Sequence, residues 1–211
     1  MLIERRCYQL RPGATNSFWQ AQELRAQGSL HALMERSYGF YSETAQGEDR
    51  IVSLYGYEDF QDWQARTQQA YADPALLSYF QAVRPLIVEQ ESMWMRAGEQ
   101  YPVNEFAQGL RRYGRSTPKG TALCEWVLAL RPGSVPQAWA DLQHDAMPGV
   151  LGVFSSFTGT LNRLVIWQEH EAAQAWDTAS FTADWPGKGV YSIKQHSLKP
   201  SPVPDLSPWQ I

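Results

Sequence analysis

Glu4, Arg6 and Tyr8 alternate near the start of this 211-residue sequence. Side chains two residues apart on a β-strand point to the same face, so a strand over residues 2–10 would place all three on one polar strip. The guanidinium can bind an anionic or carbonyl oxygen, and the phenol can donate a hydrogen bond to the same group. Glu4 would then orient Arg6, or act as a base in a desolvated site. These three are the candidate catalytic residues.

Aromatic residues on the predicted strands are the second candidate group. Strands favour aromatic side chains, and most of these rings are expected to fill the core. A cavity walled by rings and a few polar groups would also hold a small planar aromatic molecule. The candidate ligand-binding residues are Tyr41, Tyr55, Tyr57 and Trp94.

The sequence gives little support for metal or nucleophile chemistry. Glu89 and Glu91 share a strand face, but two carboxylates are a poor ligand set, so no metal is expected. The four histidines lack a metal-binding spacing, and no G-x-S-x-G motif is present. Cys7 and Cys124 are expected to be inert buried thiols. No glycine-rich nucleotide motif occurs, so no cofactor is predicted. The histidines are His31, His144, His170 and His196.

Two sequence matches, in the same order and at nearly the same separation, indicate a duplicated unit of about a hundred residues. Leu10-Arg11-Pro12-Gly13 recurs as Leu130-Arg131-Pro132-Gly133, and Asp49-Arg50-Ile51-Val52 recurs as Asn162-Arg163-Leu164-Val165. A tryptophan follows each second match, at Trp63 and Trp176.

Each unit is predicted to run strand, helix, strand, strand, helix, strand, which is the ferredoxin-like βαββαβ pattern. Such a sheet carries helices on one face only, and a second sheet can cover the bare face. We therefore expect an α+β fold in which two tandem ferredoxin-like units form an intramolecular, pseudo-two-fold α+β barrel. The expected divisions are a first unit over 1–97, a linker over 98–121, a second unit over 122–199 and a proline-rich tail over 200–211.

The two repeats differ at the polar strip. The second repeat carries Cys124, Trp126 and Leu128 at the three matching positions. This asymmetry favours one polar pocket, in the first unit, and one apolar, degenerate unit. A structural interpretation also remains open, in which Glu4 and Arg6 form an ion pair and Tyr8 fills the core.

Composition excludes several classes of protein. The sequence is 44% hydrophobic and 13% aromatic, so a disordered chain is excluded. The net charge of −4, with no basic patch, argues against nucleic acid as a partner. No apolar run approaches the length of a membrane span, and residues 1–7 do not resemble a signal peptide. With only two cysteines, a reducing, cytoplasmic setting is expected.

The first half resembles the NIPSNAP family, a branch of the dimeric α+β barrel superfamily. Residues 4–13 are similar to the family's opening strand, E-x-R-x-Y-x-L-K/R-P-G, and residues 52–57 to its V-x-H-L-W-x-Y strand. Ser53 and Tyr55 depart from that second pattern. Asp73-Pro74, Tyr79 and residues 83–91 are similar to the closing helix and strand. The resemblance is weak over residues 122–198.

The resemblance implies a fold more than an activity, because superfamily members include cofactor-free monooxygenases, haem-degrading enzymes, isomerases and plain ligand binders. We expect a protein that binds a small aromatic or carbonyl-containing molecule in the first unit, as a cofactor-independent monooxygenase or isomerase if it is an enzyme. A non-catalytic interaction or assembly module is the alternative. Haem handling would need an axial ligand such as His170 or His196. Monomer and homodimer both remain open.

Overall fold

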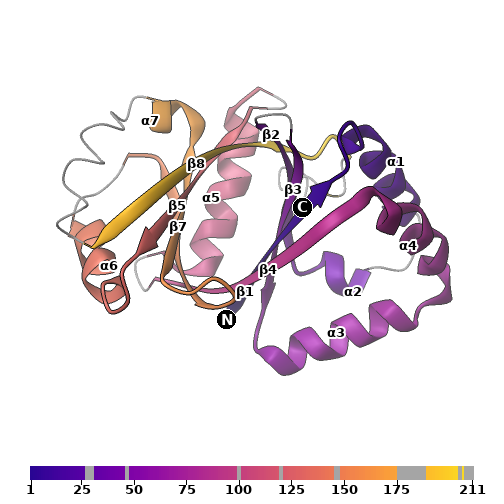
Figure 1. Cartoon of the computed structure of the whole chain (residues 1–211), viewed down its shortest axis with the longest axis horizontal. Helices are drawn as coiled ribbons and strands as arrows, with labels where there is room; N and C mark the ends of the chain where they lie inside the picture. Colours follow the sequence, from indigo (N-terminus) through magenta and orange to yellow (C-terminus); the bar gives the residue numbers. More distant parts are fainter. Residues whose placement is uncertain are drawn as a thin grey trace. The chain divides into compact units, whose positions relative to one another are not determined.

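The computed structural model describes residues 1–26, 31–45, 48–98, 101–118, 121–144, 148–174, 189–203 and 206. The chain divides into two compact units (Figure 1). Unit 1 comprises Met1–Ser92 and Lys199–Ile211, and unit 2 comprises Met93–Leu198. Both mix helices with antiparallel strands, as the α+β assignment predicted. None of the described helices is long and apolar enough to cross a membrane.

Unit 1 is an antiparallel sheet with its helices on one side (Figure 1). β3 lies between β1 and β2 and pairs with both. The end of β8 pairs with β2, through Lys199 and Pro200. The strands are β1 (Leu2–Leu10), β2 (Ser37–Ala45), β3 (Glu48–Tyr57) and the first part of β4 (Ile87–Ala97). The helices are α1 (Thr15–Ala26), α2 (His31–Met34), α3 (Phe60–Ala72), η1 (Pro74–Leu76), α4 (Leu77–Val83) and η2 (Arg84–Leu86).

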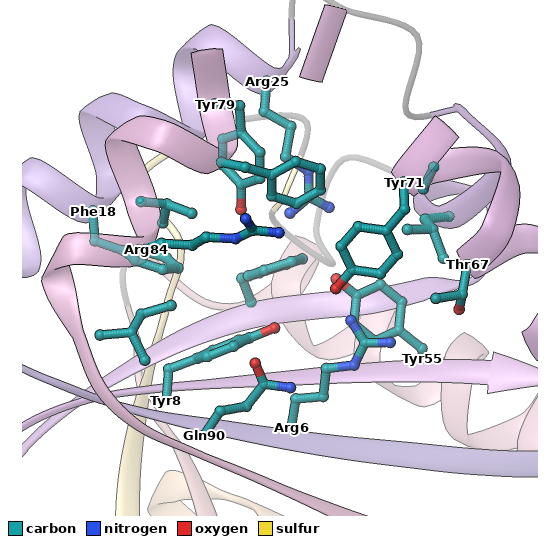
Figure 2. Close-up of a pocket in the computed structure, with 16 residues that line it drawn as sticks. Arg6, Tyr8, Phe18, Arg25, Tyr55, Thr67, Tyr71, Tyr79, Arg84 and Gln90 are labelled. Carbon is teal, nitrogen blue, oxygen red and sulfur yellow. The ribbon is translucent and has the colours of Figure 1, made fainter. Parts of the chain in front are cut away.

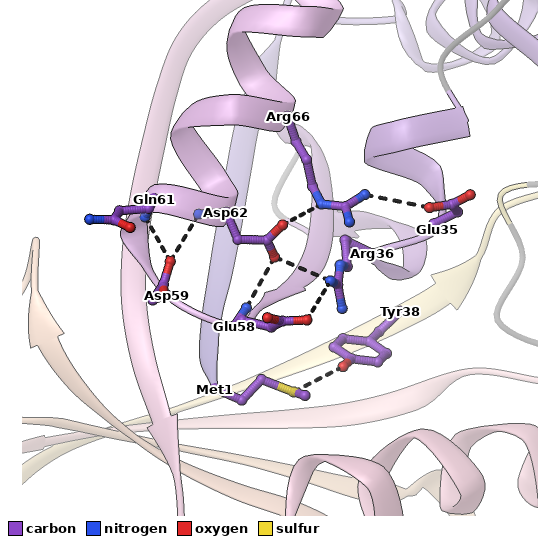
Figure 3. A network of polar contacts seen from close by, with 9 residues as sticks. All are labelled: Met1, Glu35, Arg36, Tyr38, Glu58, Asp59, Gln61, Asp62 and Arg66. Carbon is purple, nitrogen blue, oxygen red and sulfur yellow. Dashed lines mark hydrogen bonds and ion pairs between the residues drawn. The ribbon is translucent and has the colours of Figure 1, made fainter.

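Polar residues fix the start of α3. Asp59 is its N-cap and accepts hydrogen bonds from the backbone N–H groups of Gln61 and Asp62. Asp62 also accepts from Arg66 Nε at 2.6 Å and lies 3.4 Å from Arg36, as Figure 3 shows. Partly exposed ion pairs of this kind contribute little stability, on the order of 0–1 kcal/mol each. Their role here is to hold the orientation of a helix that also carries Thr67, Ala70 and Tyr71, residues of the candidate site.

Unit 2 is a second antiparallel sheet, with the strand order β8-β5-β7-β6-β4. Its strands are the end of β4, β5 (Leu123–Leu130), β6 (Val150–Thr158), β7 (Arg163–Glu169) and β8 (Val190–Pro200). Its helices are α5 (Val103–Ser116), α6 (Val135–His144) and α7 (His170–Gln174).

The first strands of the two units end in the same way. Gly13 and Gly133 both adopt positive φ, at 77° and 84°, a conformation that favours glycine. The residue after each glycine donates to the carbonyl of Arg11 or Arg131, at 3.0 and 3.1 Å. The repeated L-R-P-G therefore makes one local structure twice. The duplication of the whole unit stays a prediction.

The segment 98–121, predicted to be a linker, contains helix α5. Val103, Phe106, Leu110 and Tyr113 recur at helical spacing and are buried. The polar composition of this segment concealed that pattern. Trp176 lies outside the described residues, and α7 is described over His170–Gln174. Most of the proline-rich tail also lies outside them.

Candidate functional site

Unit 1 contains a partly enclosed cavity of about 100 Å³ between its sheet and its helices (Figure 2). The rings and aliphatic side chains that form its deep part are buried, whereas Tyr71 at the mouth is 60% exposed. The strands contribute Arg6, Tyr8, Phe40, Tyr55, Ile87 and Gln90. The helices contribute Phe18, Arg25, Leu33, Thr67, Ala70, Tyr71, Tyr79, Phe80, Val83 and Arg84.

Arg6 enters the cavity from β1 and is held there by Glu4. Nε and Nη2 of Arg6 donate to the two carboxylate oxygens of Glu4, both at 2.7 Å. Ser92 Oγ donates to the same carboxylate at 3.3 Å, and the guanidinium lies 4.9 Å from the centre of the Tyr55 ring. Burial is the largest single effect on Arg6 and lowers the pKa of its guanidinium, but the hydrogen bond to Glu4 and the electrostatic interactions with Tyr8, Tyr55 and Glu4 together raise that pKa above its ordinary value. Arg6 is therefore a fixed cation, and Glu4 is its positioning residue.

Tyr8 lies beside Arg6 on the same face of β1 and also lines the cavity. Burial raises the pKa of its phenol well above the ordinary tyrosine value, an effect that the charge of Arg6 only partly offsets. Its ring centre lies 6.2 Å from that of Phe18. Tyr8 stays protonated at neutral pH, so it can donate a hydrogen bond to a bound molecule.

Arg25 reaches the cavity from α1 on the opposite side, as Figure 2 shows. Its Nη1 donates to Gln22 Oε1 at 2.9 Å, and Gln22 Nε2 donates to the hydroxyl of Tyr79 at 2.9 Å. The guanidinium carbon lies 5.0 Å from the centre of the Phe40 ring and 5.5 Å from that of Tyr79. Gln22, which is fully buried, thus fixes both Arg25 and Tyr79.

The charge of the described lining is one-sided. Arg6, Arg25 and Arg84 are cationic, and none of the described lining residues is an aspartate, glutamate or histidine. Glu4 compensates Arg6 only. The cavity can therefore stabilise negative charge on an oxygen, but the lining that the structure describes supplies no carboxylate or imidazole base.

The predicted site residues separate into two groups. Arg6, Tyr8 and Tyr55 line the cavity, with Glu4 behind Arg6. The other three aromatic candidates do not line it. Tyr41 and Tyr57 are buried in the sheet, and Tyr41 donates to a backbone carbonyl at 3.0 Å. Trp94 lies on the part of β4 that belongs to unit 2.

The sequence interpretation missed the cavity residues that come from the helices. The one available signal was on α1, where Phe18, Gln22 and Arg25 recur at i, i+4 and i+7 and are all buried. A glutamine and an arginine on the buried face of a helix need partners inside the protein. Tyr79 and Arg84 were noted only as part of the family resemblance, which did not indicate that they line a cavity.

The other candidate groups do not form a site within the described residues. No cluster of metal-binding side chains is found there, and Glu89 and Glu91 are exposed. His170 and His196 belong to unit 2 rather than to the cavity of unit 1. Cys7 and Cys124 are free and buried, and burial raises the pKa of Cys124 to about 11.

Comparison with solved structures shows the fold. Two crystal structures of proteins named "putative monooxygenase" match 95% of this chain each. The one from Fusobacterium nucleatum has 10% identity and a TM-score of 0.58, with 92% of its chain covered. The one from Lactobacillus acidophilus has 9% identity and a TM-score of 0.54, with 93% covered. At such identities the likeness concerns the fold alone.

A NIPSNAP-like domain protein from Burkholderia xenovorans is 25% identical, with a TM-score of 0.44, over 48% of this chain and 88% of that one. No curated protein matches this chain. The family model described as NIPSNAP matches residues 3–100, which include β1, the helices around the cavity and β4. Residues 3–100 are therefore similar to the NIPSNAP family, as the opening strand predicted.

Proposed function

We propose that unit 1 binds a small aromatic or carbonyl-containing molecule in its cavity. The observation that supports this most directly is the convergence of Arg6 and Tyr8 on a space walled by aromatic rings. The guanidinium and the neutral phenol are two hydrogen-bond donors suited to one carbonyl or anionic oxygen. The rings of Phe18, Phe40 and Tyr55 would contact the flat faces of the molecule.

We further propose that any reaction in this cavity is a cofactor-independent oxygenation or isomerisation. In such an oxygenation, a CH2 group beside a carbonyl is oxidised to C=O by O2, which supplies one oxygen to the product and one to water. Arg6 and Tyr8 would stabilise the enolate that precedes oxidation. Two proteins that share the fold are named "putative monooxygenase", and this reaction class is taken from their names. Because the described lining contains no base, proton abstraction would use Glu4 or a substrate that arrives already ionised.

The alternative, a non-catalytic interaction or assembly module, predicts a filled core in unit 1. The cavity favours small-molecule binding over this alternative. We also infer a tandem duplication with a degenerate second unit, two ferredoxin-like units that close a pseudo-two-fold barrel, and a cytoplasmic protein. The shared turns at Gly13 and Gly133 support the duplication, and the two free cysteines support a reducing setting.

Native mass spectrometry of protein purified without added ligand tests binding. A reproducible extra mass, lost in Arg6→Ala and reduced in Tyr8→Phe, is the expected result. Arg11→Gln, an exposed arginine outside the cavity, is the matched control. A clean apo mass that stays unchanged with a panel of aromatic acids and quinones would instead favour the interaction module. Oxygen uptake with the bound molecule as substrate then separates oxygenation from isomerisation.

A further inference from the structure

Arg25 is the most unusual charged residue of the cavity. Its side chain is only 5% exposed, and it forms no ion pair with any carboxylate in the part of the chain that the structure describes. A buried charge is costly unless an opposite charge or several hydrogen bonds compensate it. The charge of Arg6, on the opposite wall, is compensated in the usual way, because both carboxylate oxygens of Glu4 accept hydrogen bonds from it.

The hydrogen bonds of Arg25 leave part of its capacity unused. A guanidinium has five N–H groups. One donates to Gln22 Oε1 at 2.9 Å and another to the sulfur of Met34. Nε is buried and has no hydrogen-bond partner among the described residues. Neither acceptor carries a charge, and the other groups that interact with the guanidinium are the rings of Phe40 and Tyr79 and the phenols of Tyr55 and Tyr79. None of these groups is a carboxylate.

We propose that the cavity binds an aromatic carboxylate whose carboxylate group pairs with Arg25. This rests on the proposed small-molecule binding and names its ligand class. Arg25 is held by Gln22 and by two rings, so its planar fork is pre-organised for a planar, two-oxygen anion. Arg84, which lies 5.0 Å above the Phe80 ring and points into the same cavity in Figure 2, is a second cation for the same ligand.

The size and walls of the cavity favour a single-ring carboxylate over a larger anion. About 100 Å³ of space would hold one ring between the aromatic side chains. A phosphate dianion prefers sites with several backbone N–H donors at a helix terminus or glycine-rich loop. Here the donors are side chains set among Phe40, Tyr79 and Phe80.

Benzoate and benzamide form a probe pair that isolates the charge, because they share one shape and differ in the anionic group. Isothermal titration calorimetry and ligand-observed NMR on the full chain would measure both. We expect benzoate to bind the wild type about 10- to 100-fold more tightly than benzamide, the range of a charge-assisted bidentate contact. Arg25→Gln should abolish this preference, and Arg25→Lys should restore only part of it.

Arg84→Gln is expected to lower the affinity for benzoate by a smaller factor, about 3- to 10-fold, because Arg84 is exposed. Arg11→Gln is the matched control and should bind both probes as the wild type does. If Arg25→Gln fails to fold, Arg25→Lys decides the question: a reduced preference for benzoate is expected, and an undiminished preference would overturn the pairing with Arg25.

The possible outcomes distinguish a failure of the carboxylate assignment from a failure of the proposed small-molecule binding. Equal binding of benzoate and benzamide, unchanged in Arg25→Gln, would show that Arg25 is structural and would overturn the carboxylate assignment while leaving aromatic binding intact. Absence of binding by both probes and by larger aromatic acids would overturn both proposals.

Discussion

β1 and β5 end in the same turn but carry opposite side-chain chemistry. On β1, Arg6 and Tyr8 face a cavity. On β5, the matching Trp126 and Leu128 belong to a hydrophobic cluster and are fully buried. The indole of Trp126 donates to Gln168 Oε1 at 2.8 Å, so its polar atom is satisfied. One local backbone structure thus supports either a polar cavity or a filled core.

The helices that follow these strands differ in the same sense. Phe18 and Gln22 of α1 match Ala138 and Leu142 of α6 in the repeat. Ala138 and Leu142 complete the cluster of unit 2, whereas Gln22 holds a cavity arginine. Gln22 thus accompanies a cavity in unit 1, and Leu142 accompanies a hydrophobic cluster in unit 2. The difference between the cavity of unit 1 and the hydrophobic cluster of unit 2 thus involves a few side chains of one strand and one helix in each unit.

Removing Trp126 should have the largest effect of the changes considered. Trp126→Ala leaves a cavity in unit 2 and removes the hydrogen-bond donor to Gln168 Oε1. We therefore expect a loss of about 3–5 kcal/mol in the free energy of unfolding. Urea unfolding followed by circular dichroism measures it. Tyr71→Ala, at a position 60% exposed, is the control and should change stability by no more than about 0.5 kcal/mol. A loss that small for Trp126→Ala would mean that unit 2 is not tightly packed.

Breaking the ion pair of β1 should have the next largest effect. Glu4→Gln leaves the mostly buried Arg6 without its carboxylate, and we expect a loss of about 2–3 kcal/mol. In the double variant Glu4→Gln/Arg6→Met the buried charge is absent, so part of the stability should return. With the single variant Arg6→Met these two variants complete a double-mutant cycle. If the losses of the two single variants added up to the loss of the double variant, the two side chains would not be coupled.

Alkaline pH distinguishes the buried phenol of β1 from its apolar counterpart on β5. Burial raises the pKa of Tyr8, so above pH 10 the unfolded chain loses this proton while the folded chain keeps it. The folded state is therefore destabilised as pH rises. Between about pH 8 and pH 11, Tyr8→Phe should lose about 1.4 kcal/mol less stability than the wild type. Urea midpoints at both pH values measure it, with the exposed Tyr71→Phe as control. Parallel losses in Tyr8→Phe and the wild type would contradict the raised pKa.

The smallest effect is expected from the hydroxyl of Tyr8 in binding. Tyr8→Phe should lower the affinity for para-hydroxybenzoate about fivefold, because one neutral hydrogen bond contributes about 1 kcal/mol. The affinity for benzoate should stay unchanged. Calorimetric titration of both probes gives the answer. Tyr41→Phe, which lies outside the cavity lining, should bind both as the wild type does. Equal weakening of the two probes would place Tyr8 against the ring rather than the hydroxyl.

Strand alternation and the L-R-P-G repeat were sufficient to predict the α+β class, the succession of strands along the chain and the polar strip of β1. They could not predict which rings line the cavity. Tyr55 and Tyr57 share a face by alternation, yet only Tyr55 lines it. Arg25 comes from a helix, and its distance from Arg6 in space depends on how α1 packs over the sheet. Local spacing carries no information on that packing.

The pairing of the end of β8 with β2 determines when, during synthesis, the sheet of unit 1 can be completed beside the cavity. Unit 1 includes Lys199 and Pro200, which pair with β2, and Ser201, whose N–H donates to the carbonyl of Phe40 at 2.8 Å. These residues follow unit 2 in the sequence. On a ribosome, the edge of β2 beside the cavity residue Phe40 therefore stays unpaired while unit 2 is made, for roughly 5–20 s. An open edge is prone to pair with other chains, so fast folding of unit 2, which brings β8 to β2, protects the nascent chain.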